Sequence, residues 1–169
     1  APETARQAAA EELESVVPPF RDDVALAIAY LGADPVLATP APPDELQTGE
    51  IASFYIGNVD SNTVSQIDAE LLSVGRYAYF WFDLGDGSVQ PDAAELAEVT
   101  SHFDAIYETL YDFFGVSPLP GGRAHIVHAS PNALCDAPTS CFLAGYYSSR
   151  DSLPGEIFTR SNERPMFVI

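Results

Sequence analysis

The sequence contains no lysine, and its positive charge is limited to seven arginines. Against these stand 25 aspartates and glutamates, so the formal net charge is −18 and the sequence pI is about 4.1. Such a chain is repelled by phosphate backbones and by anionic lipid surfaces, which argues against nucleic-acid binding. A long hydrophobic run is missing too. Because crossing a bilayer takes roughly 20 apolar residues, we expect no membrane span.

The sequence also lacks the common catalytic motifs. A zinc peptidase needs two histidines four residues apart on a helix with a glutamate between them, and no such motif is present. His125 and His128 are three residues apart in an expected strand, so they point to opposite faces and cannot hold one ion together. No Gly-x-Ser-x-Gly turn supports a serine nucleophile at Ser148 or Ser149. We therefore predict no catalytic residue and no metal ligand in this chain.

Cysteine is scarce as well, and the two that occur are close together. Cys135 and Cys141 enclose five residues, a spacing that suits a local disulfide but not the Cys-x-x-Cys pattern of redox or zinc pairs. The chain-entropy estimate gives such a short bridge roughly 2 kcal/mol of stabilisation. A disulfide implies an oxidising compartment, so we expect an extracellular, secreted protein. The first residue, Ala1, is not methionine, which is consistent with a removed leader or an engineered start.

The composition that is present is that of a folded protein. Hydrophobic residues make up 47% of the 169 residues, enough for one domain or for one domain with an appendage. We expect a helical arm over residues 1–45, with a weakly amphipathic helix over 3–17, a second helix from about Asp22 to Gly32 and a Pro-rich linker over 33–45. Residues 46–169 are expected to form the main domain.

The pattern of residues 46–169 predicts an α+β fold, with an antiparallel hairpin followed by a twisted sheet packed on one long helix. The helix is expected over 91–114, with Pro91 and Asp92 at its start and Gly115 as its stop. The helical spacing of six apolar residues predicts its buried face, namely Leu96, Val99, Phe103, Ile106, Leu110 and Phe113. The strands are expected at 50–57 and 64–74, which form the hairpin, and at 76–83, 123–129, 143–148 and 165–169.

Two turns rich in aspartate and asparagine bring hard oxygens together, at 58–62 and at 83–87. Calcium prefers such ligands, although neither turn completes the twelve-residue EF-hand pattern. Turn chemistry alone also explains both sequences. Calcium binding therefore stays an alternative rather than an expectation, and it is the one cofactor that these residues suggest.

Four pieces of the sequence resemble the start of the catalytic region in secreted bacterial zinc metalloproteases of the immune-inhibitor type, which are zincin-like enzymes. The pieces are Thr48–Asn62, Tyr77–Asp83, Phe103–Glu108 with Phe114-Gly115, and Ala144–Asp151 with Ser161–Ile169.

The resemblance implies a zincin-like N-terminal subdomain, in which an edge strand of the sheet pairs with the substrate backbone. The candidates for that strand are Gly145, Tyr146, Tyr147 and Ser148. In the family, the zinc helix follows the strand that 166–169 resembles, so zinc is expected only if a catalytic half follows.

Two functions remain open at this point. The chain is either a part of a secreted metallopeptidase that is not proteolytic alone, or a complete non-catalytic extracellular subunit that self-assembles through its N-terminal arm and open strand edges. The second hypothesis rests on the missing zinc motif, on an Ala-rich arm that should fray unless something holds it, and on the last strand, 165–169, which reads as an open apolar edge. Its partner is accordingly a protein or peptide strand, or a copy of the chain itself.

Overall fold

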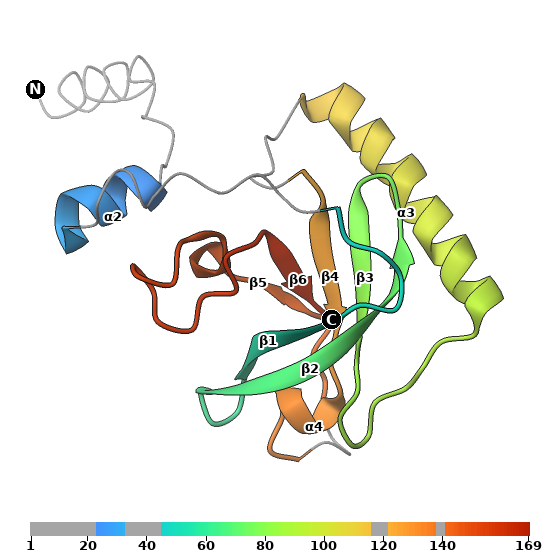
Figure 1. Cartoon of the computed structure of the whole chain (residues 1–169), viewed down its shortest axis with the longest axis horizontal. Coiled ribbons are helices and arrows are strands. Elements are labelled where there is room, and N and C mark those ends of the chain that lie inside the picture. The colour runs from blue at the N-terminus through green and yellow to red at the C-terminus, as the bar shows by residue number, and fades with distance from the viewer. Residues whose placement is uncertain (1–22, 33–44, 116–121, 138–140) are drawn as a thin grey trace, which may run out of the picture.

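A six-stranded mixed sheet and one long helix organise the part of the chain that the structure describes (Figure 1). The structure is a computed structural model, and it describes residues 23–32, 45–115, 122–137 and 141–169. The fold is mixed α and β, as predicted. Among the described residues, no helix is both long and apolar enough to cross a membrane.

Helix α2, Asp23–Leu31, is the part of the N-terminal arm that is described. It ends at Gly32, whose positive φ of 69° suits a residue without a side chain at a helix C-terminus. Both Leu26 and Tyr30 on this helix are exposed. The helix predicted over 3–17, and all but the last residue of the predicted linker, lie outside the described residues.

Strands β1, Ile51–Asn58, and β2, Thr63–Val74, form the predicted antiparallel hairpin. Their register places Asn58 opposite Thr63, next to the turn. Along β1 the side chains alternate, because successive residues of a strand point to opposite faces. Phe54 and Ile56 are fully buried in the interior of the curled sheet.

Strand β3, Ala78–Asp83, is buried along its whole length. The sequence of residues 76–83 is dense in aromatic side chains, which predicts a strand buried on one or both faces. One set of alternate residues contributes to the core under the long helix, and it includes Phe80 and Phe82. The other set, which includes Tyr79 and Trp81, contributes to the core inside the curl of the sheet. Both faces of this strand are therefore covered, which explains why its sequence shows no polar alternation.

The remaining strands complete a sheet of order β1-β2-β3-β4-β6-β5. Strand β4, Ala124–His128, runs parallel to β3, and β6, Met166–Val168, runs parallel to β4. Strand β5, Tyr146–Tyr147, pairs antiparallel with β6 and forms one edge of the sheet. The expectation that the last strand is an open edge is wrong, because the segment before it folds back and pairs with it.

Helix α3, Ala93–Phe114, has the predicted ends. The Asp92 side chain accepts a hydrogen bond from the Ala94 N–H, and Gly115 ends the helix with a φ of 80°. A parallel pair of strands needs such a long crossover, and α3 connects β3 to β4. It packs on β2 and β3 through Leu96 and Phe103, together with Thr100.

The predicted buried face of α3 is only partly correct. Leu96 is buried and Phe103 is partly buried, but the other four members of the predicted face are exposed: Val99, Ile106, Leu110 and Phe113. The reason is that α3 packs on β2 and β3, while on the same face Ala124 and Ile126 of β4 are already buried beside Leu96. The four exposed residues form a line on one side of the helix, the side on which Val99 lines a cleft with Ile126 and Ile169, and this line is called the α3 stripe below.

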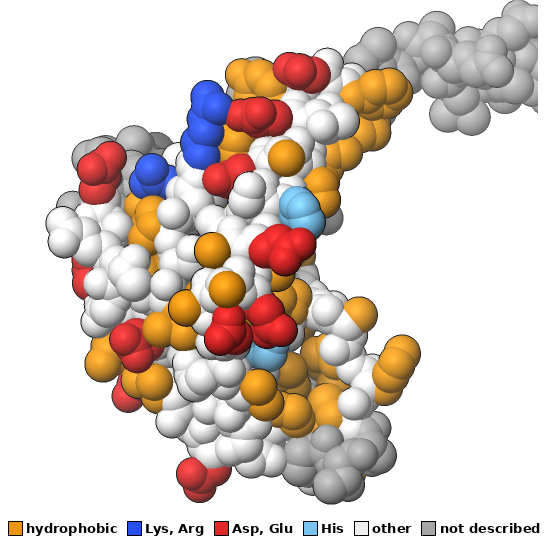
Figure 2. Space-filling model, turned by 90° about the vertical axis from the view of Figure 1, so that its right-hand side faces the viewer, with side chains coloured by type: hydrophobic (Ala, Val, Ile, Leu, Met, Phe, Trp, Pro, Cys, Tyr) orange, Lys and Arg blue, Asp and Glu red, His pale blue; other side chains and the backbone are white. Residues whose placement is uncertain are grey.

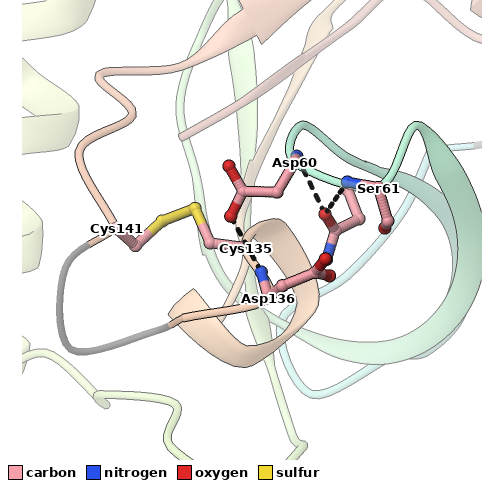
Figure 3. The surroundings of a disulfide bond; sticks show 6 residues. Asp60, Ser61, Cys135, Asp136 and Cys141 are labelled. Atoms are coloured by element: carbon pink, nitrogen blue, oxygen red, sulfur yellow. Dashed lines mark hydrogen bonds between the residues drawn. A yellow bond between two sulfur atoms is a disulfide. The ribbon is translucent and has the colours of Figure 1, made fainter.

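The predicted disulfide joins Cys135 and Cys141, with an S–S distance of 2.02 Å. It follows the short helix α4, Pro131–Leu134, and it lies beside the β1–β2 turn (Figure 3). The Asp136 N–H donates to the Asp60 carboxylate at 3.0 Å. This hydrogen bond, together with the one from the Val59 N–H to the Leu134 carbonyl, holds the loop after β4 against the hairpin.

Reduction of the disulfide is expected to lower the free energy of unfolding by about 2 kcal/mol, because the loop that it closes is short. The measurement is thermal unfolding with and without dithiothreitol. A double variant, Cys135→Ala with Cys141→Ala, should unfold near the temperature of the reduced protein and should not respond to dithiothreitol. An equal response of the wild-type protein and this variant would contradict the prediction.

Candidate functional site

Strand β5 presents an unpaired backbone edge at Tyr147. The Ile169 N–H donates to the Val127 carbonyl, so Ile169 faces β4 and its neighbour Val168 faces β5. Val168 lies opposite Tyr146, and these two residues form the hydrogen-bonded pair of the β5–β6 ladder. Because backbone direction alternates along a strand, the N–H and C=O of Tyr147 point away from β6, toward the free edge.

The two residues that flank β5 shape its ends. Gly145 has a φ of 141°, and a Cβ at this position would lie 2.7 Å from the Val168 carbonyl oxygen. Only glycine allows this close approach of the two backbones. After β5, the Ser148 carbonyl accepts a hydrogen bond from the Asp151 N–H at 3.1 Å, which starts the 3-10 helix η2, Ser149–Ser152. The exposed edge is therefore limited to Tyr147 and its immediate neighbours.

The Tyr146 side chain anchors β5 to the opposite edge of the sheet. Its hydroxyl oxygen accepts a hydrogen bond from the Gly57 N–H at 2.8 Å. Gly57 belongs to β1, so this contact spans the interior of the curled sheet. Burial raises the pKa of the Tyr146 hydroxyl, which keeps it protonated.

Asn162 covers the other edge, on β1. Its side-chain oxygen accepts the Tyr55 N–H at 2.7 Å, and its side-chain N–H group donates to the Tyr55 carbonyl at 2.9 Å. The amide thereby reproduces the two hydrogen bonds that a neighbouring strand would make. The same N–H group donates to Asp151 at 2.7 Å, and burial raises the pKa of that carboxyl. Asn162 thus occupies the β1 edge at Tyr55, whereas no described residue pairs with the free edge of β5.

An apolar groove lies between α3 and strands β3 and β4, near Ile169. It includes a cavity of about 230 Å³, and the space-filling view shows the molecule hollowed along one side with hydrophobic side chains beside the hollow (Figure 2). Six of the residues that line this groove, called the α3 groove below, are Phe82, Leu96, Val99, Ile126, His128 and Ile169.

The floor of the α3 groove continues to β5. Phe167 lies opposite Ile126 in the parallel ladder, so both side chains point to the face on which α3 packs. Phe167 in turn lies opposite Tyr147, and their ring centroids are 5.3 Å apart. Both rings are about half exposed, at 43% and 53%. An apolar surface of this extent is typical of an interaction site.

The described part of the chain contains no ligand set for zinc, because no three of its His, Cys, Asp or Glu residues lie close enough together to hold an ion. His125 contributes to the opposite face of β4 from the groove, because its Nδ1 accepts the Trp81 indole N–H at 3.0 Å. Burial lowers the pKa of His125 to about 3, so its ring is neutral. His128 lines the groove and stacks on Phe82. The two histidines thus face opposite sides of the sheet.

In the two turns considered for calcium, side-chain oxygens accept hydrogen bonds from backbone N–H groups of the protein. Asp83 is buried, and its two carboxylate oxygens accept the backbone N–H groups of Gly85 and Ser130. In the other turn, the Asn58 side chain accepts the N–H groups of Asp60 and Ser61 (Figure 3). Such hydrogen bonds are usual for turns rich in aspartate and asparagine, and they are the alternative to calcium binding considered for these two sequences.

Sequence reasoning selected Gly145, Tyr146, Tyr147 and Ser148, and the structure places the middle two on β5 and the outer two at its ends. It did not select Asn162, because no pattern in a single sequence shows which strand edge an amide reaches. A scan against protein-family models and a search of curated proteins find no match to this chain.

Proposed function

We propose that residues 46–169 are the peptide-binding part of a secreted protein related to zinc metallopeptidases. One observation carries the proposal, namely the antiparallel edge strand β5 with the backbone of Tyr147 directed outward. An extended peptide could add to this edge as a further strand, with its backbone paired to Tyr147 and its side chains over Phe167. The disulfide supports an oxidising, extracellular location.

The family resemblance agrees with the arrangement around β5. In such enzymes an edge strand binds the substrate backbone, and the zinc helix follows the strand that β6 resembles. The bare apolar surface beside α3 is where a further helix could pack on this sheet. Because the described residues hold no zinc ligand set, the chain alone is expected to bind a peptide without cleaving it.

Peptide binding is tested best at the backbone of Tyr147. Tyr147→Pro removes its outward N–H and keeps the β5–β6 hydrogen bonds, which involve Tyr146. For a fluorescein-labelled peptide of alternating valine and threonine, we expect affinity to fall about tenfold, in line with the loss of one hydrogen bond. Tyr147→Val is the matched control, because it also loses the ring but keeps the N–H.

Equal binding by the proline and valine variants would overturn the proposal. Hydrogen exchange of the wild-type protein supplies a second measurement in case the proline variant misfolds. The Tyr147 amide should exchange fast in the free protein and several-fold more slowly with the peptide bound. Fast exchange under peptide saturation would count against pairing at β5.

Self-assembly remains the second candidate, and one observation favours it. Helix α2 is apolar and carries exposed side chains at Leu26 and Tyr30. Against pairing through strand edges stands the contact of Asn162 with β1, which leaves that edge without free groups at Tyr55. An assembly would therefore use helix α2 rather than β1.

A further inference from the structure

The α3 stripe and the α3 groove together leave a large apolar surface without a partner. The stripe follows α3 from Val99 through Ile106 and Leu110 to Phe113, residues that lie on one side of a helix because they are seven, four and three positions apart. Three of them are more than half exposed, and Leu110 is 49% exposed. The groove continues this surface toward β3 and β4. An apolar helix lying along α3 would cover part of this surface.

Helix α2 is such a helix. Its nine residues, Asp23–Leu31, contain one charged side chain, at the first position, and their other side chains are apolar or tyrosine. A helix that is apolar all round is stable in water only when it is buried against another surface. Leu26 and Tyr30 are exposed in the structure, so α2 has apolar surface available for docking.

The tether allows the contact. Twelve residues, 33–44, connect α2 to the main domain, and an extended chain of that length spans up to about 40 Å. The domain end of the tether lies beside the start of β3, where the Leu46 N–H donates to the Tyr79 hydroxyl. Arg123, at the start of β4, donates to the same hydroxyl. Arg123 also donates to the Arg76 carbonyl, and the Arg76 side chain pairs with Glu108 of α3, so the tether starts near the C-terminal half of the stripe.

Charge selects α2 over the other possible occupants. Helix α3 carries five acidic residues and no arginine or lysine, and Glu95 lines the groove itself. A second copy that offered its own α3 would bring two acidic helices together, and the segment 3–17 carries glutamates as well. Repulsion disfavours both, whereas α2 is almost uncharged. A tether of this length also gives α2 a millimolar effective concentration at the groove.

We propose that α2 docks on the α3 stripe of its own molecule, beside the α3 groove. The inference rests on the proposed function and deepens it, because α2 then occupies part of the apolar surface on which that proposal packs a further helix.

A photo-crosslinker at the exposed Tyr30 tests the proposal in the full chain. With p-benzoylphenylalanine in place of Tyr30, irradiation should join α2 to residues 99–113 or to β6 of the same molecule, as mapped by mass spectrometry. Ile106→Glu puts a charge in the stripe and should lower this yield at least tenfold. The matched control is Ala105→Glu, an exposed residue on the other side of α3, which should leave the yield unchanged.

Three outcomes would overturn the inference. They are crosslinks between molecules, crosslinks to other parts of the domain, and equal yields in the two glutamate variants. Ile106→Glu and Ala105→Glu both replace exposed residues, so we expect unchanged unfolding temperatures. Measuring these temperatures checks that both variants keep the fold. Peptide binding at β5 is measured separately through Tyr147→Pro. A failure of α2 docking is therefore distinguishable from a failure of the proposed function.

Discussion

Asn162→Ala is expected to lower the free energy of unfolding by about 3 kcal/mol. The amide makes two hydrogen bonds to the Tyr55 backbone and one to Asp151, and it is buried, at 7% exposure. Alanine leaves the Tyr55 N–H and C=O without partners in a partly buried place, and each such group costs about 1–3 kcal/mol. Urea denaturation measures the loss.

Two further variants decide whether the loss comes from the β1 edge. Asn162→Asp keeps an acceptor for the Tyr55 N–H, but it places a second carboxylate against Asp151, so at pH 7 it should destabilise more than alanine does. Asn132→Ala is the control, because Asn132 is exposed and makes one hydrogen bond, to the Asp86 carbonyl. It should cost about 1 kcal/mol or less. A loss in Asn162→Ala no greater than in this control would contradict the structural role of Asn162.

Acidification is expected to destabilise the protein through His125. Its pKa is lowered to about 3, first by burial and then by the positive charge of Arg164, while in the unfolded chain it is about 6.5. Between these two values the unfolded chain takes up a proton that the folded protein does not. Stability therefore falls as the pH decreases below 6.5, by about 1.4 kcal/mol per pH unit. From pH 7 to pH 5 the expected loss is about 2 kcal/mol.

The test compares His125→Asn with the wild-type protein by urea denaturation at pH 7, 6 and 5. Asparagine keeps an acceptor near the Trp81 indole N–H but does not titrate, so the variant should lack this part of the pH dependence. Asp151 has a raised pKa, which acts in the opposite direction, and the comparison cancels its contribution. His102→Asn, at an exposed helix position, should keep the wild-type slope. Parallel pH profiles of the His125 variant and the wild-type protein would contradict the prediction.

Local pattern was enough to predict most of the elements. The aromatic run around Trp81 predicted a strand buried on one or both faces, and the Asp92 and Gly115 signals predicted the ends of α3. The hairpin followed from alternation on both sides of the 58–62 turn. The spacing of Cys135 and Cys141 predicted the disulfide. These features depend on neighbours in the sequence, which is why one sequence suffices for them.

The choice of sheet neighbours needed the tertiary structure. The apolar run at 166–169 reads as an open edge, yet β5 pairs with it, so that the predicted edge strand around Tyr147, and not this run, lies at the edge of the sheet. The partners of Asn162 are equally invisible in the sequence, since Tyr55 is 107 residues away.

By itself, then, the sequence determined that this is an acidic, disulfide-linked α+β protein with a long amphipathic helix and a hairpin. Which part of each apolar pattern is buried was decided by tertiary packing. Periodicity marks Val99 and Ile106 as apolar in the same way as Leu96, but α3 packs chiefly on β2 and β3, so Leu96 is buried and the other two stay exposed. The physical reason is that hydrophobic spacing shows which side chains favour burial. The position of the surface that buries them depends on contacts between residues that are far apart in the sequence.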